Sequence, residues 1–253
     1  MTGPVVAVST KAYLGFDETR DWVRAVARYA DEVAALGVEV VVLPTFPALE
    51  STADLLAGTG IAWGAQDVAP SADGAQTGEV TAAVLAELGC RYVEVGHAER
   101  RRLFGDNPET VRAKMTEVVT AGMIPLLCVG EVDRTDPGTA AALCADQARD
   151  ALTGLPEADV LLGYEPQWAI GAPTPAPAAH VLAVLAGLRA ALASHPGRLR
   201  IVYGGAAGPG LATDLGPGVD GLFLGRFAHD PRQLHAVIRE IAALHFSPPD
   251  PHA

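Results

Sequence analysis

Lysine is scarce in this chain of 253 residues. Only Lys11 and Lys114 occur among its 18 basic residues, and all the others are arginine. Cysteine is scarce as well, with Cys90, Cys128 and Cys144 and no CxxC spacing. An odd number of cysteines without that spacing argues against a disulfide framework and favours a reduced, cytoplasmic protein.

Other absences exclude whole classes of protein. No apolar run approaches the roughly 20 residues of a membrane span, so no membrane association is expected. The net charge of −12 argues against a nucleic-acid partner, which would require a basic surface. No cluster of histidine, cysteine and carboxylate has the spacing of metal ligands, and we expect neither a metal nor a cofactor. The chain starts with a strand-like run and not with a charged-then-apolar signal segment, which also favours the cytoplasm.

What the chain does have is a repeated alternation of short apolar runs and amphipathic segments. The runs predict strands at residues 5–9, 38–43, 61–65, 92–96, 124–129, 160–164, 199–203 and 221–224. Each is followed by a helix-like segment, the first over residues 17–36. Eight such units predict an α/β fold, a single (β/α)8 barrel over residues 1–246 with a frayed tail at 247–253. An open doubly wound sheet would favour a GxGxxG turn, which is absent.

Polar residues that follow the strands of such a barrel meet at one mouth. His97 follows the fourth strand, just before a predicted helix start, which disfavours an imidazolium and favours a neutral ring that donates a hydrogen bond. Glu165 follows the sixth strand beneath the segment "PQWAIG", which predicts a lid. A carboxylate under a lid is partly desolvated, so we expect a raised pKa and the role of general base.

The remaining polar groups complete this constellation. Lys11 follows the first strand and can place a point charge beside a developing oxyanion. Gly204, Gly205 and Gly225 follow the last two strands, where loops of a barrel often present amides to a phosphate. Taken singly, each signal is weak, and a lone histidine or lysine favours a structural role. Together they predict proton abstraction next to a carbonyl, with a lid that excludes water.

The same segments resemble the triosephosphate isomerase family. "VEVGHAERRRLFGD" is similar to its GHSERR stretch and "GYEPQWAIG" to its YEPVWAIG stretch, and "GAQTGE", "LCVGE" and "YGG" also match, in the same order. The resemblance implies Glu165 as base, His97 as neutral electrophile, Lys11 as electrostatic stabiliser and Gly171 as a lid amide that meets the phosphate. It also implies a homodimer through the loop at residues 66–79, with Thr77 inserted into the neighbouring site. Glu99 is expected to hold the Lys11 ammonium in place.

The chain departs from the family pattern at positions that fit the substrate. Ser9 stands where the family has asparagine, and it is shorter and leaves room. Ala98 and Ala206 each replace a serine. Arg226 replaces a glycine, and its fork of donors either contributes to phosphate binding or crowds the pocket. Pro173 and Pro175 in the far hinge of the lid fix two φ angles and should change how the lid moves.

Three functions remain open on this sequence. The first is interconversion of dihydroxyacetone phosphate and glyceraldehyde 3-phosphate. The second is a related isomerase of a longer ketose phosphate, such as erythrulose phosphate, which Ser9 and Ala206 motivate. The third is a sensor that binds a phosphorylated sugar without catalysis, supported by Ala98, Ala206 and Arg226. A glycosidase would need two facing carboxylates, for which only Glu131 and Glu165 offer themselves.

Overall fold

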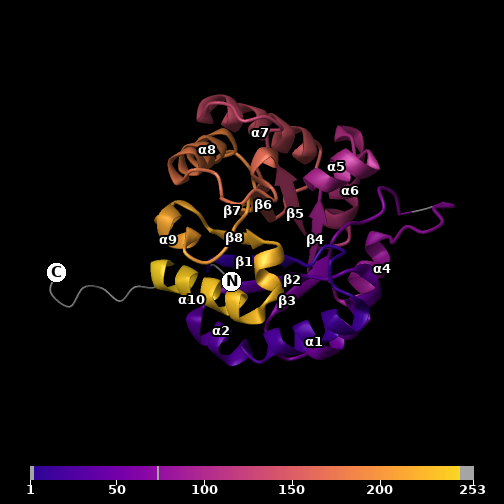
Figure 1. Cartoon of the computed structure of the whole chain (residues 1–253). Coiled ribbons are helices and arrows are strands. Elements are labelled where there is room, and N and C mark those ends of the chain that lie inside the picture. Colours follow the sequence, from indigo (N-terminus) through magenta and orange to yellow (C-terminus); the bar gives the residue numbers. More distant parts are fainter. Residues whose placement is uncertain (1–2, 73, 246–253) are drawn as a thin grey trace.

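The computed structural model describes residues 3–72 and 74–245, and shows a closed barrel of eight parallel strands (Figure 1). Each strand pairs with the next along the chain, and the eighth pairs with the first. The strands are β1 Val5–Ser9, β2 Glu39–Leu43, β3 Ala62–Ala65, β4 Tyr92–Val95, β5 Ile124–Val129, β6 Val160–Tyr164, β7 Leu199–Tyr203 and β8 Gly221–Leu224. The predicted (β/α)8 barrel is confirmed. The predicted tail at 247–253 lies outside the described residues, and the domain boundary at 246 stays a prediction.

Helices surround the barrel on all sides (Figure 1). They are α1 Phe16–Ala27, α2 Ala30–Leu36, α3 Leu49–Leu56, α4 Ala82–Leu88, α5 Ala98–Phe104, α6 Pro108–Thr120, α7 Pro137–Leu152, α8 Ala178–Ala191, α9 Leu211–Leu215 and α10 Pro231–His245. Short 3₁₀ turns add η1 Phe46–Ala48, η2 Gln167–Ala169, η3 Gly216–Gly218 and η4 Arg226–His229. Over the described residues, no helix has the length and apolar character needed to cross a bilayer.

The helix predicted over residues 17–36 is two helices, and this correction has a local cause. The backbone leaves helical geometry at Tyr29, where φ is −91° and ψ is 0°. The break allows the Tyr29 ring to stack on His235 of α10, with ring centroids 4.0 Å apart. His235 in turn lies 2.9 Å from a carboxylate oxygen of Glu32. Packing against α10 therefore decides where the amphipathic segment bends.

Two apolar clusters account for the core. The larger lies between the strands and the surrounding helices, and the smaller fills the barrel interior. The interior cluster consists of Val5, Ala7, Val41, Leu43, Ala62, Tyr92, Leu126, Cys128, Leu161, Val202 and Phe223. Because every strand is covered on both faces, almost all strand residues are apolar.

A charged network also lies inside the barrel, within the strands themselves. Arg200 of β7 donates to a carboxylate oxygen of Glu39 on β2 at 2.6 Å. The Tyr92 hydroxyl of β4 donates to the other oxygen at 2.8 Å and accepts from Arg200 at 2.8 Å. Arg91 reaches Glu39 from the surface at 3.4 Å. These bonds satisfy a carboxylate that is fully buried.

The loop between β3 and α4 projects far from the barrel body (Figure 1). Lys114 on α6 holds its base, because the buried ammonium donates to both oxygens of Asp67, at 2.7 and 3.0 Å, and to Asp106 at 2.7 Å. Arg100 contacts the same two carboxylates. Thr77, the residue expected to enter a neighbouring site, is exposed on this loop. The projection thus starts from a rigid charged anchor.

Candidate active site

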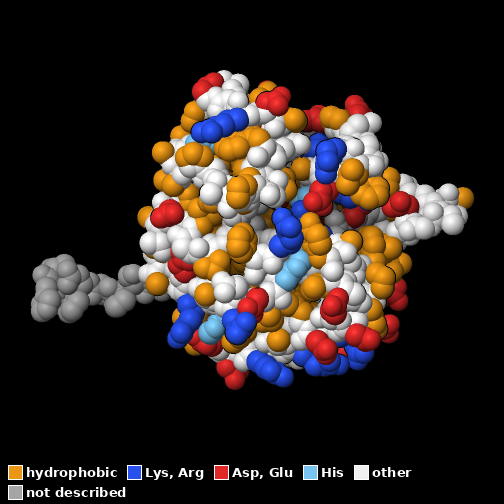
Figure 2. All heavy atoms as spheres, in the orientation of Figure 1, with side chains coloured by type: hydrophobic (Ala, Val, Ile, Leu, Met, Phe, Trp, Pro, Cys, Tyr) orange, Lys and Arg blue, Asp and Glu red, His pale blue; other side chains and the backbone are white. Residues whose placement is uncertain are grey.

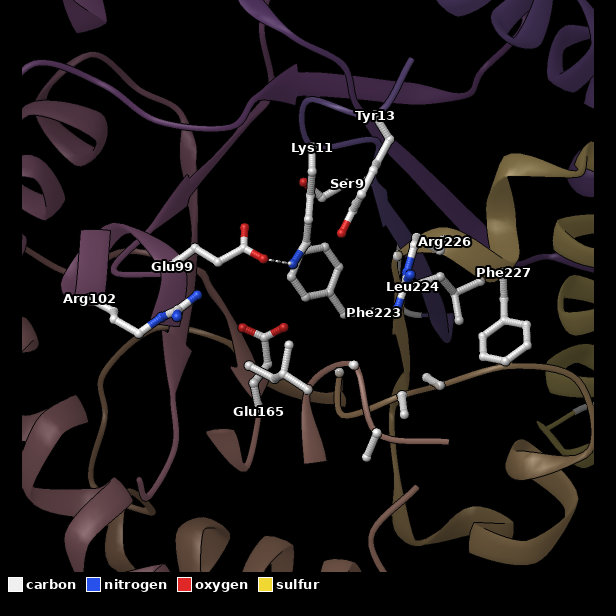
Figure 3. A pocket seen from close by; sticks show the side chains of 17 residues that line it. Ser9, Lys11, Tyr13, Glu99, Arg102, Glu165, Phe223, Leu224, Arg226 and Phe227 are labelled. Carbon is white, nitrogen blue, oxygen red and sulfur yellow. Dashed lines mark hydrogen bonds and ion pairs between the residues drawn. The ribbon is translucent and has the colours of Figure 1, made fainter. Parts of the chain in front are cut away.

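A cavity of about 250 Å³ opens at the carboxyl ends of the strands, where the sequence places the site (Figure 3). It is lined by Ser9, Lys11, Tyr13, Glu99, Arg102, Glu165, Ile170, Gly171, Ala172, Gly204, Ala206, Ala207, Phe223, Leu224, Gly225, Arg226 and Phe227. Lys11, Glu99 and Glu165 point toward one another on one side, and Tyr13 and Arg226 lie on the other (Figure 3). The surface view shows basic side chains at the centre of this face (Figure 2), despite the net charge of −12.

Lys11 occupies a strained backbone position at the end of β1. Its φ is +50°, a left-handed conformation that costs a non-glycine residue about 1 kcal/mol or more. The side-chain amide of Gln66 stabilises this turn by donating to the carbonyls of Leu43 at 2.8 Å and Lys11 at 3.2 Å. The ammonium donates to Glu99 at 2.8 Å, so the expected Lys11–Glu99 bond is present. Burial lowers the pKa of Lys11, but Glu99 and then Glu165 more than offset this and raise it, which keeps the ammonium charged.

His97 precedes the first turn of α5, and its ring is almost fully buried. The Glu99 amide donates to its Nδ1 at 3.0 Å, so this nitrogen carries a lone pair and not a proton. Burial lowers the pKa of His97, but the carboxylates of Glu165 and Glu94 outweigh burial and raise the pKa above its ordinary value. The two influences conflict with the amide contact. An imidazolium would place its Nδ1–H against the amide N–H of Glu99, two donors with no acceptor between them. The ring is therefore neutral, with its proton on Nε2.

Glu165 follows β6 and is also buried. Its Oε2 lies 3.6 Å from His97 Nε2 and has no hydrogen-bond partner among the described residues. The expected rise in pKa is wrong. Burial acts in that direction, but the Nε2–H of His97, which faces the carboxylate, and then the ammonium of Lys11 outweigh it and lower the pKa of Glu165. The carboxylate is consequently ionised at neutral pH, as a proton acceptor must be.

The donors of this site converge on one point. His97 Nε2 and Lys11 Nζ are 3.3 Å apart, and each carries protons that it cannot give to the other. An oxygen placed between them accepts from both, which is the arrangement that stabilises a developing oxyanion. The unpartnered oxygen of Glu165 lies beside the same point. Chemically, the site can remove a proton from a carbon next to a carbonyl while it neutralises the oxygen.

The predicted phosphate side is only partly as expected. Gly171, Gly225 and Ala206 line the cavity, and Ala206 has a φ of +50°. Gly204 lines the cavity too, but its amide donates to the Tyr164 carbonyl at 2.9 Å and is therefore not free to donate to a phosphate. Gly204 has a steric role, because a Cβ there would lie 2.7 Å from Cγ of Glu165. Absence of a side chain at this position makes room for the carboxylate.

Alanine at position 204 is therefore expected to push Glu165 away from His97. We expect Gly204→Ala to lower kcat by about 100-fold, because misplacement of a catalytic group by about 1 Å has effects of that size. Gly138→Ala, in the exposed first turn of α7, is the matched control, since a Cβ there meets only the side-chain oxygen of Asp136, at 3.2 Å. The measurement is steady-state kinetics of both variants. Unchanged kcat in Gly204→Ala would contradict the steric role.

Arg226 faces the cavity, an orientation that the sequence did not determine. Its guanidinium carbon lies 5.7 Å from the Tyr13 ring centroid, and one terminal nitrogen would be 3.9 Å from a Cβ at Gly171. The side chain lies opposite Glu99 and Arg102 (Figure 3). A fork of donors therefore lies next to the lid, on the side of the cavity remote from Glu99.

The lid is bonded at both ends to buried groups. Trp168 of η2 donates to Glu131 at 2.8 Å, and the Tyr164 hydroxyl donates to the same oxygen at 3.1 Å. At the far end, the Ala176 amide donates to the Tyr203 hydroxyl at 3.0 Å. Glu131 does not line the cavity, so it does not face Glu165 as a glycosidase pair would.

One group at the site was missed by the sequence analysis. Glu94 of β4 is buried, and its Oε1 lies 3.9 Å from His97 Nε2. The signal was a carboxylate inside the otherwise apolar strand "YVEV", which is costly to bury without a partner or a role. Gln66 was missed as well, because its hydrogen bonds to the Lys11 turn have no sequence signature.

Comparison with known proteins gives a consistent result. A sequence model of the triosephosphate isomerase family matches residues 4–241. The chain is 43% identical to an L-erythrulose-1-phosphate isomerase of Pectobacterium atrosepticum, over 94% of this chain and 96% of that protein. It is 38% identical to a triosephosphate isomerase of Symbiobacterium thermophilum, over 94% and 96%, and 37% identical to one of Thermus thermophilus, over 93% and 97%. The chain therefore belongs to the triosephosphate isomerase family and is an isomerase.

Proposed function

We propose that this isomerase moves the carbonyl of a phosphorylated ketose by one carbon through an enediolate. One observation carries the proposal: Lys11 Nζ lies 3.3 Å from His97 Nε2, and a carboxylate oxygen of Glu165 lies 3.6 Å from the same nitrogen. Base, neutral donor and cation are the three groups that this reaction requires. A sensor without catalysis would need none of them in this arrangement.

The steps follow from the geometry. Glu165 takes the proton from the carbon next to the carbonyl, and the C–H electron pair becomes the C=C bond of the enediolate. The carbonyl π pair moves to oxygen, where the N–H of His97 and the ammonium of Lys11 stabilise the charge. His97 moves a proton between the two oxygens, and Glu165 returns its proton to the neighbouring carbon. No atom is gained or lost, so no cofactor enters the balance.

The substrate that we propose is erythrulose phosphate. Starting from L-erythrulose 1-phosphate, Glu165 removes the proton from C3, and its return to C2 moves the carbonyl from C2 to C3. Compared with dihydroxyacetone phosphate, this substrate carries an extra hydroxymethyl group on the carbon that loses its proton. Ser9 lines the cavity and is short, which supports a larger substrate. The relative that is 43% identical has this substrate in its name.

Triose phosphate is the second candidate, supported by the relatives that are 38% and 37% identical. The two are separated by kcat/KM of the purified protein on L-erythrulose 1-phosphate and on dihydroxyacetone phosphate. We expect the four-carbon substrate to be preferred by about 100-fold or more, since each fitted polar contact is worth that much in discrimination. A triose preference of several orders of magnitude would overturn the choice of substrate.

For the phosphate we propose the opposite side of the cavity. Arg226, the backbone of Gly225 and the lid residue Gly171 line that side. A guanidinium binds phosphate with two parallel hydrogen bonds, and it offsets the repulsion that a net charge of −12 exerts on an anion. Arg226 thus replaces the phosphate contacts that the family's serine hydroxyl would make, which Ala206 cannot make.

The homodimer stays a prediction, as does the cytoplasmic location. Its proposed interface is the projecting loop with Thr77 and the apolar side chains around it. Tyr13, Phe46, Leu103 and Phe104 are large and exposed, and hydrophobic side chains are visible beside the base of the loop (Figure 2). The molecular mass in solution tests this, because a dimer has twice the 26.1 kDa of the chain.

A further inference from the structure

Three charged residues stand inside the apolar strands of this barrel: Glu39, Glu94 and Arg200. Two of them satisfy each other, because Arg200 donates to Glu39 at 2.6 Å and Tyr92 completes the network. Glu94 has no such partner. A charged side chain that is buried in a strand without a hydrogen-bond partner is costly, and its presence requires an explanation.

The surroundings of Glu94 show what is unsatisfied. Its side chain is 4% exposed, and Oε2 is buried without a hydrogen-bond partner among the described residues. Oε1 is 3.9 Å from His97 Nε2, which is too far for a hydrogen bond. Lys11 and Glu165 are close enough to influence its charge, and the Ser9 hydroxyl stabilises its ionised form. Glu94 therefore lies directly beneath the groups that line the cavity.

A sugar hydroxyl is a suitable hydrogen-bond partner for the unpaired carboxyl oxygen of Glu94. Burial raises the pKa of Glu94 to about 7 and the charge of Glu165 adds to the rise, so both protonation forms exist near neutral pH. The ionised form accepts hydrogen bonds, and the neutral form both donates and accepts. A hydroxyl group does both, so it pairs with either form. A phosphate or a carboxylate would pair only with the neutral one.

The three-carbon reaction leaves no hydroxyl for this carboxyl. Its two oxygens at the reacting carbons take the donors of His97 and Lys11, and its remaining oxygens belong to the phosphate. A four-carbon ketose phosphate carries one hydroxyl more, on the carbon attached to the reacting pair. Ser9 lines the cavity next to Glu94, and its short side chain leaves space there for that group.

We infer that Glu94 is a specificity-determining residue, which binds the additional hydroxyl of a four-carbon ketose phosphate at the floor of the cavity beside Ser9. This inference rests on the proposed function, because it assigns a contact to its preferred substrate. A site built around a substrate hydroxyl rejects analogues that lack it, since the buried polar group is then left unpaired. Selectivity over triose phosphate follows from the same contact.

The test is kcat/KM of Glu94→Leu and Glu94→Gln on L-erythrulose 1-phosphate and on dihydroxyacetone phosphate. We expect Glu94→Leu to lower the ratio of the four-carbon value to the triose value by about 100-fold, and this ratio cancels any effect of Glu94 on the shared proton transfer. Glu94→Gln should lose less, because an amide still bonds a hydroxyl. Glu131→Gln is the control, a buried carboxyl beneath the lid that should change both values by the same factor.

Inhibition by unreactive polyol phosphates provides a readout that does not depend on turnover. Erythritol 4-phosphate should lose affinity in both Glu94 variants, and glycerol 3-phosphate should not. If Glu94→Leu does not fold, Glu94→Gln alone decides, with a loss of about tenfold expected for the four-carbon inhibitor. Suppose that the wild-type protein isomerises both substrates. If the ratio of the two kcat/KM values is then the same in the Glu94 variants as in the wild type, this inference alone is overturned. A wild-type protein that isomerises only triose phosphate overturns the proposed substrate as well.

Discussion

Replacing Glu165 by glutamine is expected to lower kcat by about 10³-fold or more, because a positioned general base contributes about 10²–10⁴-fold to a proton transfer. Glutamine keeps the shape of the side chain and loses the ability to accept a proton. Oε2 of Glu165 has no hydrogen-bond partner to lose among the described residues, so the folded state should tolerate the change. The measurement is kcat on whichever ketose phosphate the wild-type protein isomerises.

The pH profile gives an independent check of the same residue. Burial raises the pKa of Glu165, but the Nε2–H of His97 and then the ammonium of Lys11 hold it below its ordinary value. The base should therefore stay ionised across neutral pH, and kcat/KM of the free enzyme should fall only when the pH drops below the ordinary glutamate range. Glu157→Gln, on the surface between α7 and β6, is the matched control for the charge change. Activity of Glu165→Gln within tenfold of the wild type would remove Glu165 from the role of base.

Replacing Arg200 by methionine is expected to destabilise the barrel by about 3 kcal/mol, the lower end of the range for breaking a buried ion pair. Glu39 would remain fully buried after losing the guanidinium at 2.6 Å, and Tyr92 would lose a donor at 2.8 Å. Arg91, at 3.4 Å, compensates only in part because its side chain is 43% exposed. Urea unfolding of both proteins measures the difference in free energy.

The double variant Arg200→Met with Glu39→Gln is the control. It removes the unpaired charge, so it should recover most of the loss, as buried pairs replaced together usually do. The pH dependence has a defined sign. The pKa of Glu39 is lowered in the folded wild type, since Arg200 outweighs burial, so its stabilising effect is present above the unfolded pKa and lost as the pH falls through the folded one. The gap between wild type and Arg200→Met should therefore narrow in acid, and equal stability at neutral pH would contradict the account.

The fold could be predicted because its signals are local and repeated. Eight apolar runs, each followed by an amphipathic segment, allow few arrangements other than a closed parallel barrel. Helix boundaries were less accessible. The bend at Tyr29 depends on His235, a contact far away in the sequence, and no local pattern predicts it. The five-residue helix α9 is too short to show a period.

The site was predictable to the extent that topology alone positions it. His97, Glu165 and Lys11 each follow a strand, and parallel strands bring their carboxyl ends to one mouth. The pKa values of the site residues were harder to predict from the sequence. The pKa of Glu165 depends on two cationic or polar neighbours whose distances only the folded chain defines, and burial alone gave the wrong direction. Gly204 was assigned to a phosphate because a turn glycine and a glycine that makes space for a neighbour look alike in sequence.

Solvent exchange tests the central claim most directly, because Glu165 must hold the substrate proton on an oxygen that exchanges with water. The isomerase is incubated with erythrulose phosphate in D₂O, and NMR follows deuterium at the two carbons of the reacting pair. We predict that the wild-type protein incorporates deuterium at these carbons only, and that Glu165→Gln incorporates it at the uncatalysed rate. Isomerisation by the wild type without any deuterium uptake, or uptake by Glu165→Gln at the wild-type rate, would contradict the proposed proton transfer.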